Sequence, residues 1–326
     1  MTDGTDTRRI RVRVADRREA ADDVVLLRLE PMDGGKLPDW EAGAHLDLQL
    51  PSGLTRQYSL CGDPWDTRAY TVCVQCEHQG RGGSLEVHRA LRAGVELSVR
   101  APRNHFPLMP ATSFVFVAGG IGITPIKAMI DEVERRGAQW RLVYGGRGRS
   151  AMAFAGELAA HGPGRVHLVP QDEEGLIDVA GLVATVEDGA HVFCCGPTGL
   201  LDAVTEACTA EGLSDRLHIE RFTATEEPQT TLRAGAADVG FEVEMRASGV
   251  TVQVGAGQSI LEVVRTVRDD IDFSCQEGYC GTCETRVLAG KPEHRGSLMS
   301  PEEHDEEGTM LICVGRSRSE RLALDL

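Results

Sequence analysis

Three cysteines lie within nine residues near the C-terminal end of the chain, in the stretch FSCQEGYCGTCETRV. Their spacing is C-x4-C-x2-C, and a fourth cysteine follows in MLICVGRS. Thiolates that bind one metal centre must converge, and Gly278 and Gly281 let the backbone between them bend with positive φ. A C-x4-C-x2-C run with a distant fourth cysteine is the spacing of plant-type 2Fe-2S centres. The sequence therefore predicts a 2Fe-2S cluster bound by Cys275, Cys280, Cys283 and Cys313.

A zinc site or plain packing fits these cysteines less well. Zinc sites usually use paired C-x2-C ligands, and this loop contains one such pair. Inert packing is disfavoured because the loop is polar and rich in glycine. Elsewhere, Cys73 and Cys76 also form C-x2-C, but within an expected strand, where positions i and i+3 face opposite sides. We expect those two, like Cys61, Cys194 and Cys208, to serve packing.

Length and composition limit the class of protein. The chain has 326 residues, of which 41% are hydrophobic, which suits two or three globular domains. Its most apolar stretch, FVFVAGGIGITPIKAMI, is broken by glycines, a proline and a lysine, which argues against a membrane span. The polar N-terminus lacks the apolar core of a signal peptide. We therefore expect a cytoplasmic protein, in which ten cysteines would not form a disulfide framework.

The formal net charge is −16. Such a chain repels phosphate backbones and anionic lipids, so nucleic acids and membranes are poor partners. The charge is concentrated, because 17 Asp and Glu but only 9 Lys and Arg lie from Ala237 onward. We expect a partner with a basic surface, and the candidate docking residues are Glu302, Glu303, Asp305, Glu306 and Glu307.

The first block, residues 1–109, contains the strand-like stretches IRVRVAD, VVLLRLEP, HLDLQL, TRQYSL, AYTVCVQCE and VELSVRAP, with one helix, SLEVHRALR. Short strands with regular turns indicate an antiparallel β-barrel. In residues 110–226, the apolar stretches SFVFVA, RLVYGG, RVHLVPQD and HVFCCG alternate with the amphipathic helices TPIKAMIDEVERRG and PTGLLDAVTEACTAEG. This alternation of strands and helices indicates an α/β domain with a parallel sheet.

The stretch TATEEPQTTLRAGAAD has no period, and we assign residues 227–238 to a linker. The third block, residues 239–326, opens with a predicted hairpin, VGFEVEMRASGVTVQV, joined by a Ser-Gly turn. A helix, SILEVVRTVRD, the cysteine loop and a strand, LICVGRS, are expected to follow.

Two glycine-rich loops suggest anion sites. Gly119, Gly120 and Gly122 follow a strand, and Thr124 and Pro125 are expected as the N-cap and first residue of the next helix. Glycines allow close approach to the backbone and a helix N-terminus favours phosphate, which indicates a nucleotide site at the edge of the parallel sheet. The alternatives are a tight structural turn here and a plain helix cap in GRGGS of the first block. The stretch FCCGPTG joins another strand to a helix in the same way.

The motifs RQYSL, GRGGS, PRNHFPL, GGIGITP, CGP and IERF and the four cysteines occur in this order over nearly the whole chain. Together they resemble the phthalate dioxygenase reductase and vanillate O-demethylase reductase family. The resemblance implies a multidomain protein with an antiparallel β-barrel that binds FMN, an α/β parallel-sheet domain that binds NADH, and an α+β ferredoxin domain of β-grasp form. The chain has Gly315 where the family often has Ser, and we expect a small effect.

The resemblance also implies roles for single residues. The flavin should contact Arg56, Tyr58, Ser59, Leu60, Cys73 and Val74, and its phosphate should lie at Arg81, Gly82, Gly83 and Ser84. The nicotinamide site should include Gly119, Gly120, Gly122, Ile123, Thr124, Arg147, Cys195, Gly196 and Pro197. Phe222 should cover the flavin ring, and the expected catalytic residues are Thr124, Cys195 and Phe222. Arg147, Arg149 and Ser150 could hold a 2′-phosphate, although the resemblance favours NADH over NADPH.

We therefore expect the reductase component of an oxygenase system, which passes electrons from NADH through FMN and the 2Fe-2S cluster to a terminal oxygenase. A flavin takes up hydride and can release electrons singly, whereas the cluster carries one at a time. The partner would be a Rieske non-haem iron oxygenase or a haem-thiolate monooxygenase of the cytochrome P-450 type, docking at the ferredoxin domain of a monomer. The alternatives are a diaphorase or flavin reductase with a small acceptor, a non-catalytic redox sensor, and a structural zinc protein.

Overall fold

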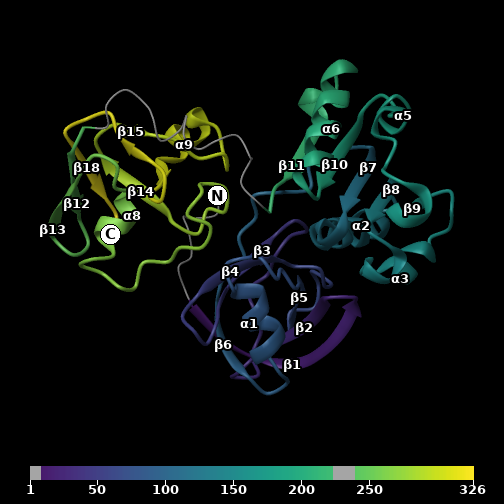
Figure 1. Ribbon diagram of the computed structural model, residues 1–326, viewed down its shortest axis with the longest axis horizontal. Coiled ribbons are helices and arrows are strands. Elements are labelled where there is room, and N and C mark those ends of the chain that lie inside the picture. The colour runs from purple at the N-terminus through teal and green to yellow at the C-terminus, as the bar shows by residue number, and fades with distance from the viewer. Residues whose placement is uncertain (1–8, 223–238) are drawn as a thin grey trace. The chain divides into compact units, whose positions relative to one another are not determined.

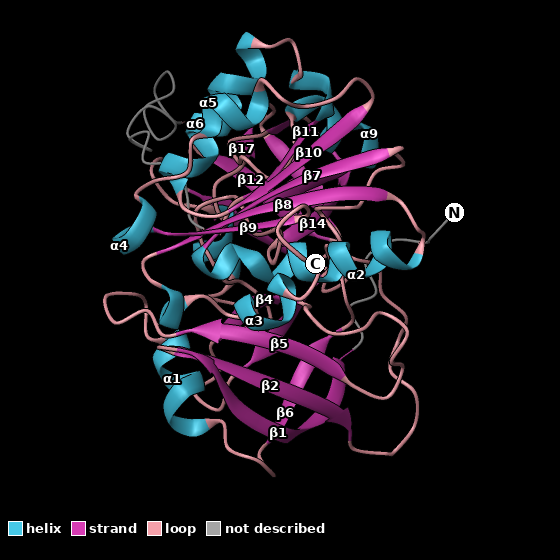
Figure 2. Ribbon diagram, turned by 90° about the vertical axis from the view of Figure 1, so that its right-hand side faces the viewer, coloured by secondary structure: helices cyan, strands magenta, loops and turns pink. Residues whose placement is uncertain are grey.

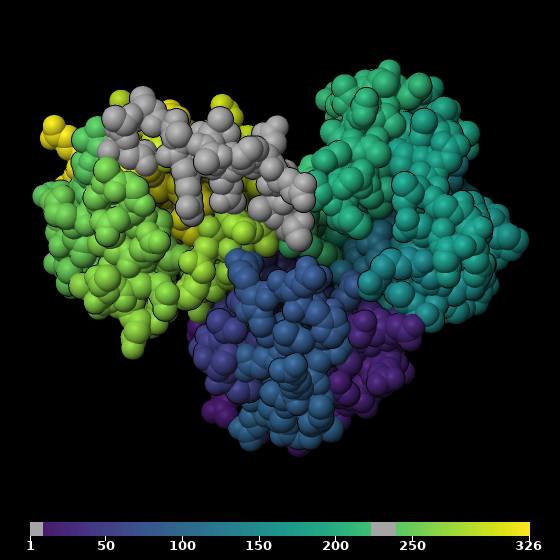
Figure 3. Space-filling model, viewed as in Figure 1, coloured from purple at the N-terminus to yellow at the C-terminus, as the bar shows by residue number. Residues whose placement is uncertain are grey.

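The computed structural model describes residues 9–222 and 239–326. The chain forms two compact units, Met1–Phe222 and Thr223–Leu326, which are coloured by residue number in Figures 1 and 3. The predicted linker, residues 227–238, lies outside the described residues. The finer domain boundaries, at residues 109 and 226, stay a prediction. None of the helices in the described ranges is long and apolar enough to cross a membrane.

The first block is an antiparallel six-stranded sheet with the order β4-β3-β6-β1-β2-β5. A bridge between Leu60 and Val72 joins the two edge strands, and the backbone N–H of Cys61 donates to the carbonyl of Thr71 (3.0 Å). These contacts close the sheet, so the predicted barrel is confirmed. Its elements are β1 (Arg9–Ala21), β2 (Val24–Pro31), β3 (His45–Gln49), β4 (Thr55–Ser59), β5 (Tyr70–Gln75), α1 (Gly83–Ala90) and β6 (Glu96–Arg100).

The second block is a parallel sheet with the order β11-β10-β7-β8-β9. Figure 2 shows helices α2 and α3 on one face of it and α5 and α6 on the other. The strands are β7 (Ser113–Gly119), β8 (Gln139–Gly146), β9 (Val166–Pro170), β10 (Ala190–Cys195) and β11 (Leu217–Glu220). The helices are α2 (Ile123–Arg135), α3 (Ala155–Ala159), α4 (Gln171–Glu174), α5 (Val179–Val183) and α6 (Thr198–Ala210), with short 3-10 turns η1 (Gly120–Gly122), η2 (Arg149–Ala151) and η3 (Ser214–Arg216).

The order of the chain through this sheet reverses between β7 and β10, which are adjacent. In open α/β sheets, ligands bind beyond the carboxyl ends of the strands at such a point. Alternation along β10 places its two cysteines in different cores, because Cys194 packs with α5 and α6 whereas Cys195 packs in the core cluster that includes α2. The packing role predicted for Cys194 is therefore confirmed.

The second unit has a mixed sheet with the order β13-β12-β18-β14-β16, in which β12 and β18 are parallel. Helix α8 supplies three buried side chains, Ile260, Leu261 and Val264, to the core of this unit. The elements are β12 (Phe241–Met245), β13 (Val250–Val254), α8 (Ile260–Val264), β14 (Glu284–Ala289), β15 (Pro292–Glu293), α9 (Pro301–Glu307), β16 (Thr309–Leu311), β17 (Arg316–Ser317) and β18 (Arg321–Leu324). The predicted hairpin is β12–β13, and its turn has Gly249 at φ +69°. This is the expected β-grasp arrangement.

Two predicted elements of this unit are wrong in extent. The helix SILEVVRTVRD ends at Val264, because only its first turn has apolar residues to bury and Val267 is 50% exposed. The strand LICVGRS is two strands separated by a turn, in which the N–H of Gly315 donates to the carbonyl of Leu311 (2.8 Å). That turn carries Cys313. Helix α9 was not predicted, although Ser300 and Glu303 form a capping box that the sequence shows.

Candidate cofactor and coenzyme sites

The cysteine loop between α8 and β14 has no regular structure, and its backbone bends sharply. Gly278 and Gly281 have φ of +79° and +69°, as the spacing predicted, and Gln276 has φ +59°. A Cβ at Gly278 would lie 2.9 Å from the Cα of Gly296, so the loop is also covered closely by a second backbone segment. Glycine at position 278 is thus required both by conformation and by space.

The four predicted ligands are brought together. Cys275, Cys280, Cys283 and Cys313 are all buried, with 2–7% exposed. The thiol of Cys275 contacts those of Cys280 and Cys313, and Cys313 contacts Cys283. The contact with Cys275, and then burial, raise the pKa of the Cys280 thiol well above its ordinary value.

This donor set fits a two-iron cluster. The N–H groups of Cys275 and Glu277 donate to the sulfurs of Cys280 (3.4 Å) and Cys275 (3.3 Å), which favours thiolates. Thiols crowded at this spacing lose their protons when a metal binds. Among residues 9–222 and 239–326, no three His, Cys, Asp or Glu side chains are grouped as a site for one metal ion. The four sulfurs instead contact one another in a row, from Cys280 to Cys275 to Cys313 to Cys283.

The predicted flavin phosphate loop meets the predicted flavin strand. The guanidinium Nη2 of Arg56 on β4 donates to the carbonyl of Arg81 (3.1 Å), and a Cβ at Gly83 would lie 2.4 Å from Arg56 Nε. Gly82 caps α1 with φ +83°. Ser84 Oγ accepts from the N–H of Glu77 (2.9 Å), which leaves its hydroxyl proton available. An arginine and a glycine-rich helix N-terminus together form a cradle of the kind that holds a phosphate.

The remaining predicted flavin residues line the seam where β4 meets β5. Ser59, Leu60, Cys73 and Val74 are buried, and the thiol of Cys73 is hydrogen-bonded to that of Cys61. Tyr58 is partly buried beside Arg56, and burial raises the pKa of its phenol. The packing role predicted for Cys61 is confirmed, since it lies in the barrel core.

The two predicted nucleotide loops touch at the carboxyl edge of the parallel sheet. A Cβ at Gly122 would lie 2.2 Å from the carbonyl oxygen of Cys195, and one at Gly119 would lie 2.6 Å from Pro197 Cδ. Gly196 in turn lies against the backbone of Gly119. The glycines therefore let the ends of β7 and β10 pack without side chains between them. Gly119 and Gly122 are buried by this contact, whereas Gly120 and Gly196 are partly exposed at the switch point of the sheet.

The prediction that Thr124 caps α2 is wrong. The helix continues from η1 and begins at Ile123, with Gly122 at the N-cap. The Thr124 hydroxyl donates to the carbonyl of Ile121 (3.0 Å), and Thr124 is 2% exposed. Arg147 lies beyond the end of β8, where its carbonyl accepts from the N–H of Asp172 (3.3 Å).

A partly buried acid, Glu220, which was not predicted from the sequence, lies beside Cys195. The Sγ of Cys195, a residue with no exposed area, lies 3.9 Å from Oε2 of Glu220 at the end of β11. Burial raises the pKa of Glu220 to about 8, so the carboxyl is mostly protonated at neutral pH. The sequence feature that could have indicated this residue is the single acid at the end of the strand LHIE. Phe222 follows two residues later and packs against the core of the first unit.

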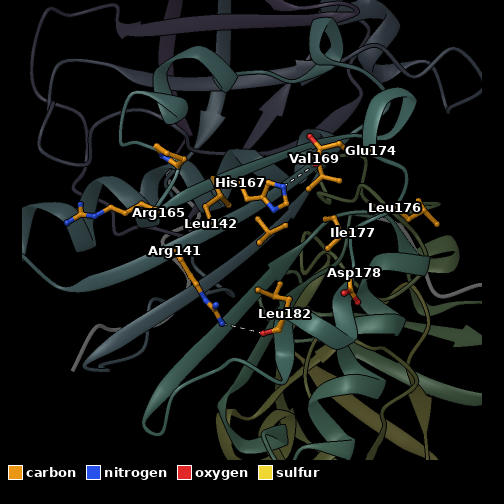
Figure 4. A pocket seen from close by; sticks show the side chains of 13 residues that line it. Arg141, Leu142, Arg165, His167, Val169, Glu174, Leu176, Ile177, Asp178 and Leu182 are labelled. Carbon is orange, nitrogen blue, oxygen red and sulfur yellow. Dashed lines mark hydrogen bonds and ion pairs between the residues drawn. The ribbon is translucent and has the colours of Figure 1, made fainter.

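A pocket of about 470 Å³ lies elsewhere, between β8, β9 and the segment around α5 (Figure 4). Its polar groups are bonded within the protein. Arg141 donates to the carbonyl of Leu182 (3.3 Å), and His167 Nε2 lies 3.2 Å from Glu174 Oε2. None of the predicted site residues lines it.

Comparison with known proteins accounts for both units. Residues 243–317 match the family model of the 2Fe-2S iron-sulfur cluster binding domain, and residues 116–206 match that of the oxidoreductase NAD-binding domain. The phenoxybenzoate dioxygenase subunit beta of Ectopseudomonas oleovorans is 43% identical over 309 residues, which are 94% of each chain.

Solved structures of oxygenase-system proteins match over 98% of this chain. Phthalate dioxygenase reductase matches with a TM-score of 0.70 and 34% identity over 98% of its own length. An intact type IV self-sufficient cytochrome P450 monooxygenase matches with a TM-score of 0.85 and 40% identity, and this chain spans 41% of it. The chain therefore belongs to the phthalate dioxygenase reductase and vanillate O-demethylase reductase family, the NAD-binding, 2Fe-2S reductases of oxygenase systems.

Proposed function

We propose that this chain oxidises NADH and delivers the electrons singly, through FMN and the 2Fe-2S cluster, to a terminal oxygenase. The observation that carries the proposal is the convergence of the four cysteines in a ferredoxin unit that is part of the same chain as the nucleotide-binding sheet. A small acceptor would need no such outward relay.

Different residues would bind the flavin and the nicotinamide coenzyme. When bound, FMN accepts hydride and releases single electrons, and the cluster carries one electron outward. Arg56 with the Arg81–Ser84 loop would hold the flavin phosphate, and Leu60, Cys73 and Val74 would offer mainly backbone groups, because their side chains are buried. The Gly119–Gly122 and Cys195–Pro197 loops would hold the pyrophosphate and orient the nicotinamide.

Glu220 and Cys195 would exclude water and supply a neutral polar pair next to the nicotinamide. Phe222, which follows β11, would cover the flavin until NADH displaces it. Thr124 would act through the position of η1, since its hydroxyl already donates to Ile121.

A matched pair of cysteine variants tests the relay. In Cys283→Ser, reduction of cytochrome c by NADH should fall by at least about tenfold, while reduction of ferricyanide by the flavin should stay within about twofold, since the cluster is lost and the flavin is kept. Cys76→Ser, half-buried and outside the loop, should change neither. Retention of both activities would favour a diaphorase, because the flavin would then serve both acceptors without the cluster, and equal loss of both would contradict the division of the relay into flavin and cluster.

The partner would dock at the ferredoxin unit. The chain is similar to components of two dioxygenase systems, for phenoxybenzoate and for phthalate, and to part of a P450 monooxygenase. These similarities support both a non-haem iron oxygenase and a P450 enzyme as the partner class. The exposed acids of α9 are Glu302, Glu303, Asp305, Glu306 and Glu307, and the intervening His304 is buried. These acids would steer a basic partner surface, so the association rate should fall as salt rises. A rate for Glu306→Gln/Glu307→Gln equal to that of the natural chain at low salt would contradict this.

The chain would act as a monomer in the cytoplasm, as the sequence predicted. Sedimentation of the holoprotein tests the first point, and a concentration-independent monomer is expected.

A further inference from the structure

Two loops next to the nucleotide site leave the same edge of the sheet. Strands β8 and β9 are parallel and adjacent, and Gly146 on the first pairs with Pro170 on the second. The segments that follow them therefore emerge side by side, on the edge that also carries Gly119 and Cys195. A dinucleotide whose pyrophosphate lies at the β7–β10 switch point has its adenosine close to these segments.

The two segments are joined by charged contacts. The Nε of Arg149 donates to both carboxylate oxygens of Glu173, at 2.9 and 3.0 Å. The N–H of Asp172 donates to the carbonyl of Arg147, and a Cβ at Gly148 would lie 2.8 Å from Asp172 Oδ2. Glycine at position 148 thus lets the carboxylate of Asp172 approach the loop that carries both arginines.

The balance of charge at this edge is acidic. Asp172, Glu173 and Glu174 are consecutive and form the end of α4. Glu174 also contacts His167, as the dashed line in Figure 4 shows. All three carboxylates act on Arg149, and the hydrogen bond to Glu173, which has the largest effect, raises the pKa of its guanidinium.

The ion pair contributes little to stability. The side chains of Arg149 and Glu173 are 56% and 48% exposed, so water and salt screen the attraction between them. It does determine where the guanidinium points, because Nε is held by a carboxylate. A 2′-phosphate, which carries close to two negative charges, would have to displace that carboxylate and then lie next to Asp172.

We propose that Glu173, supported by Asp172, sets the preference of this reductase for NADH by occupying Arg149 and repelling the 2′-phosphate of NADPH. The inference rests on the proposed function, because it names the residues that choose the coenzyme. A ribose with a free 2′-hydroxyl carries no charge and can donate to these carboxylates, so NADH is accepted.

Binding measurements test the proposal without redox chemistry. Isothermal titration of the full-length holoprotein with 5′-AMP and with adenosine 2′,5′-bisphosphate gives the ratio of the two dissociation constants. For Glu173→Gln, the bisphosphate should bind at least about tenfold more tightly than to the natural chain, since a charge-assisted bond to Arg149 becomes available. The affinity for 5′-AMP should change less than about threefold, because that ligand has no 2′-phosphate.

Two further variants isolate the cause. In Arg149→Gln/Glu173→Gln, the gain in bisphosphate affinity should disappear. Glu211→Gln removes an exposed carboxylate at the C-terminal end of α6. In that variant the ratio of the two dissociation constants should stay that of the natural chain. The ratio of kcat/KM for NADPH to that for NADH should follow the ratio of affinities.

An unchanged ratio in Glu173→Gln, or a gain that survives loss of Arg149, would overturn the proposal. Failure of 5′-AMP to bind the natural chain would overturn it as well, since this edge would then not hold adenosine. Failure of the proposed function is a separate result, because it would show as absent flavin reduction by NADH whatever the adenosine ligands do.

Discussion

The contact between Gly122 and Cys195 makes a quantitative prediction. In Gly122→Ala, the new Cβ would lie 2.2 Å from the carbonyl oxygen of Cys195 and 2.7 Å from the N–H nitrogen of Gly196. Both are backbone atoms at the end of β10, so no rotamer change relieves the contact, and the two loops must separate by about 1 Å. Overpacking of this kind costs about 1–3 kcal/mol.

A loss of that size lowers the melting temperature of a unit of this length by roughly 2–12 °C. Separation of the loops also opens the nucleotide edge, so kcat/KM for NADH should fall by about tenfold or more. The assay is thermal unfolding followed by far-UV circular dichroism, together with steady-state kinetics. The matched control is Gly156→Ala in α3, where the added Cβ meets no atom within 4 Å, and a slight stabilisation is expected. A Gly122→Ala variant that melts within about 1 °C of the natural chain with the same kcat/KM would refute the reasoning.

Three further predictions concern the other sites. Because burial raises the pKa of Glu220 to about 8, the folded chain keeps a proton that the unfolded chain releases above its ordinary pKa of 4.5. Stability should therefore fall with rising pH between about 5 and 8, by up to about 1.4 kcal/mol per pH unit, and Glu220→Gln should flatten that slope in thermal unfolding; equal slopes would contradict it. Gly83→Ala should weaken FMN binding by at least about tenfold in a fluorescence titration, because its Cβ would lie 2.4 Å from Arg56 Nε, and unchanged affinity would remove the cradle from the account. Cys280→Ser should abolish the visible absorbance and EPR signal of the cluster while flavin content stays the same, and a retained signal would show that another ligand set holds the iron.

Local patterns were enough to predict most of the fold. The alternation in residues 9–109 and the strand–helix rhythm of the second block correspond to β1–β6 and to the parallel sheet, because each element buries a face that its own sequence shows. The wrong predictions concern segments whose backbone conformation depends on residues far away in the sequence. Leu311 to Gly315 form a turn rather than a strand, since Cys313 must reach cysteines on another segment. Thr124 is not the N-cap, because η1 leads directly into a helix that begins at Ile123, two residues before the predicted first residue Pro125.

Contiguous motifs predicted the local backbone of the candidate site, while the roles of its residues stay predictions. The C-x4-C-x2-C run, GRGGS and GGIGITP each specify a local backbone, and the structure brings each to the expected neighbours. Contacts between remote segments were not predictable in this way. Glu220 reaches Cys195 from the next strand, and Glu173 reaches Arg149 across 24 residues. Such pairs depend on strand order and register, which hydrophobic periodicity does not specify.

The most direct test of the relay is an anaerobic titration of the holoprotein with NADH, followed by absorbance and by EPR of frozen samples. We expect the flavin absorbance to bleach and a rhombic signal with an average g below the free-electron value to grow with it. Flavin reduction without that signal would contradict the relay, because the four buried cysteines would then not hold a working 2Fe-2S centre.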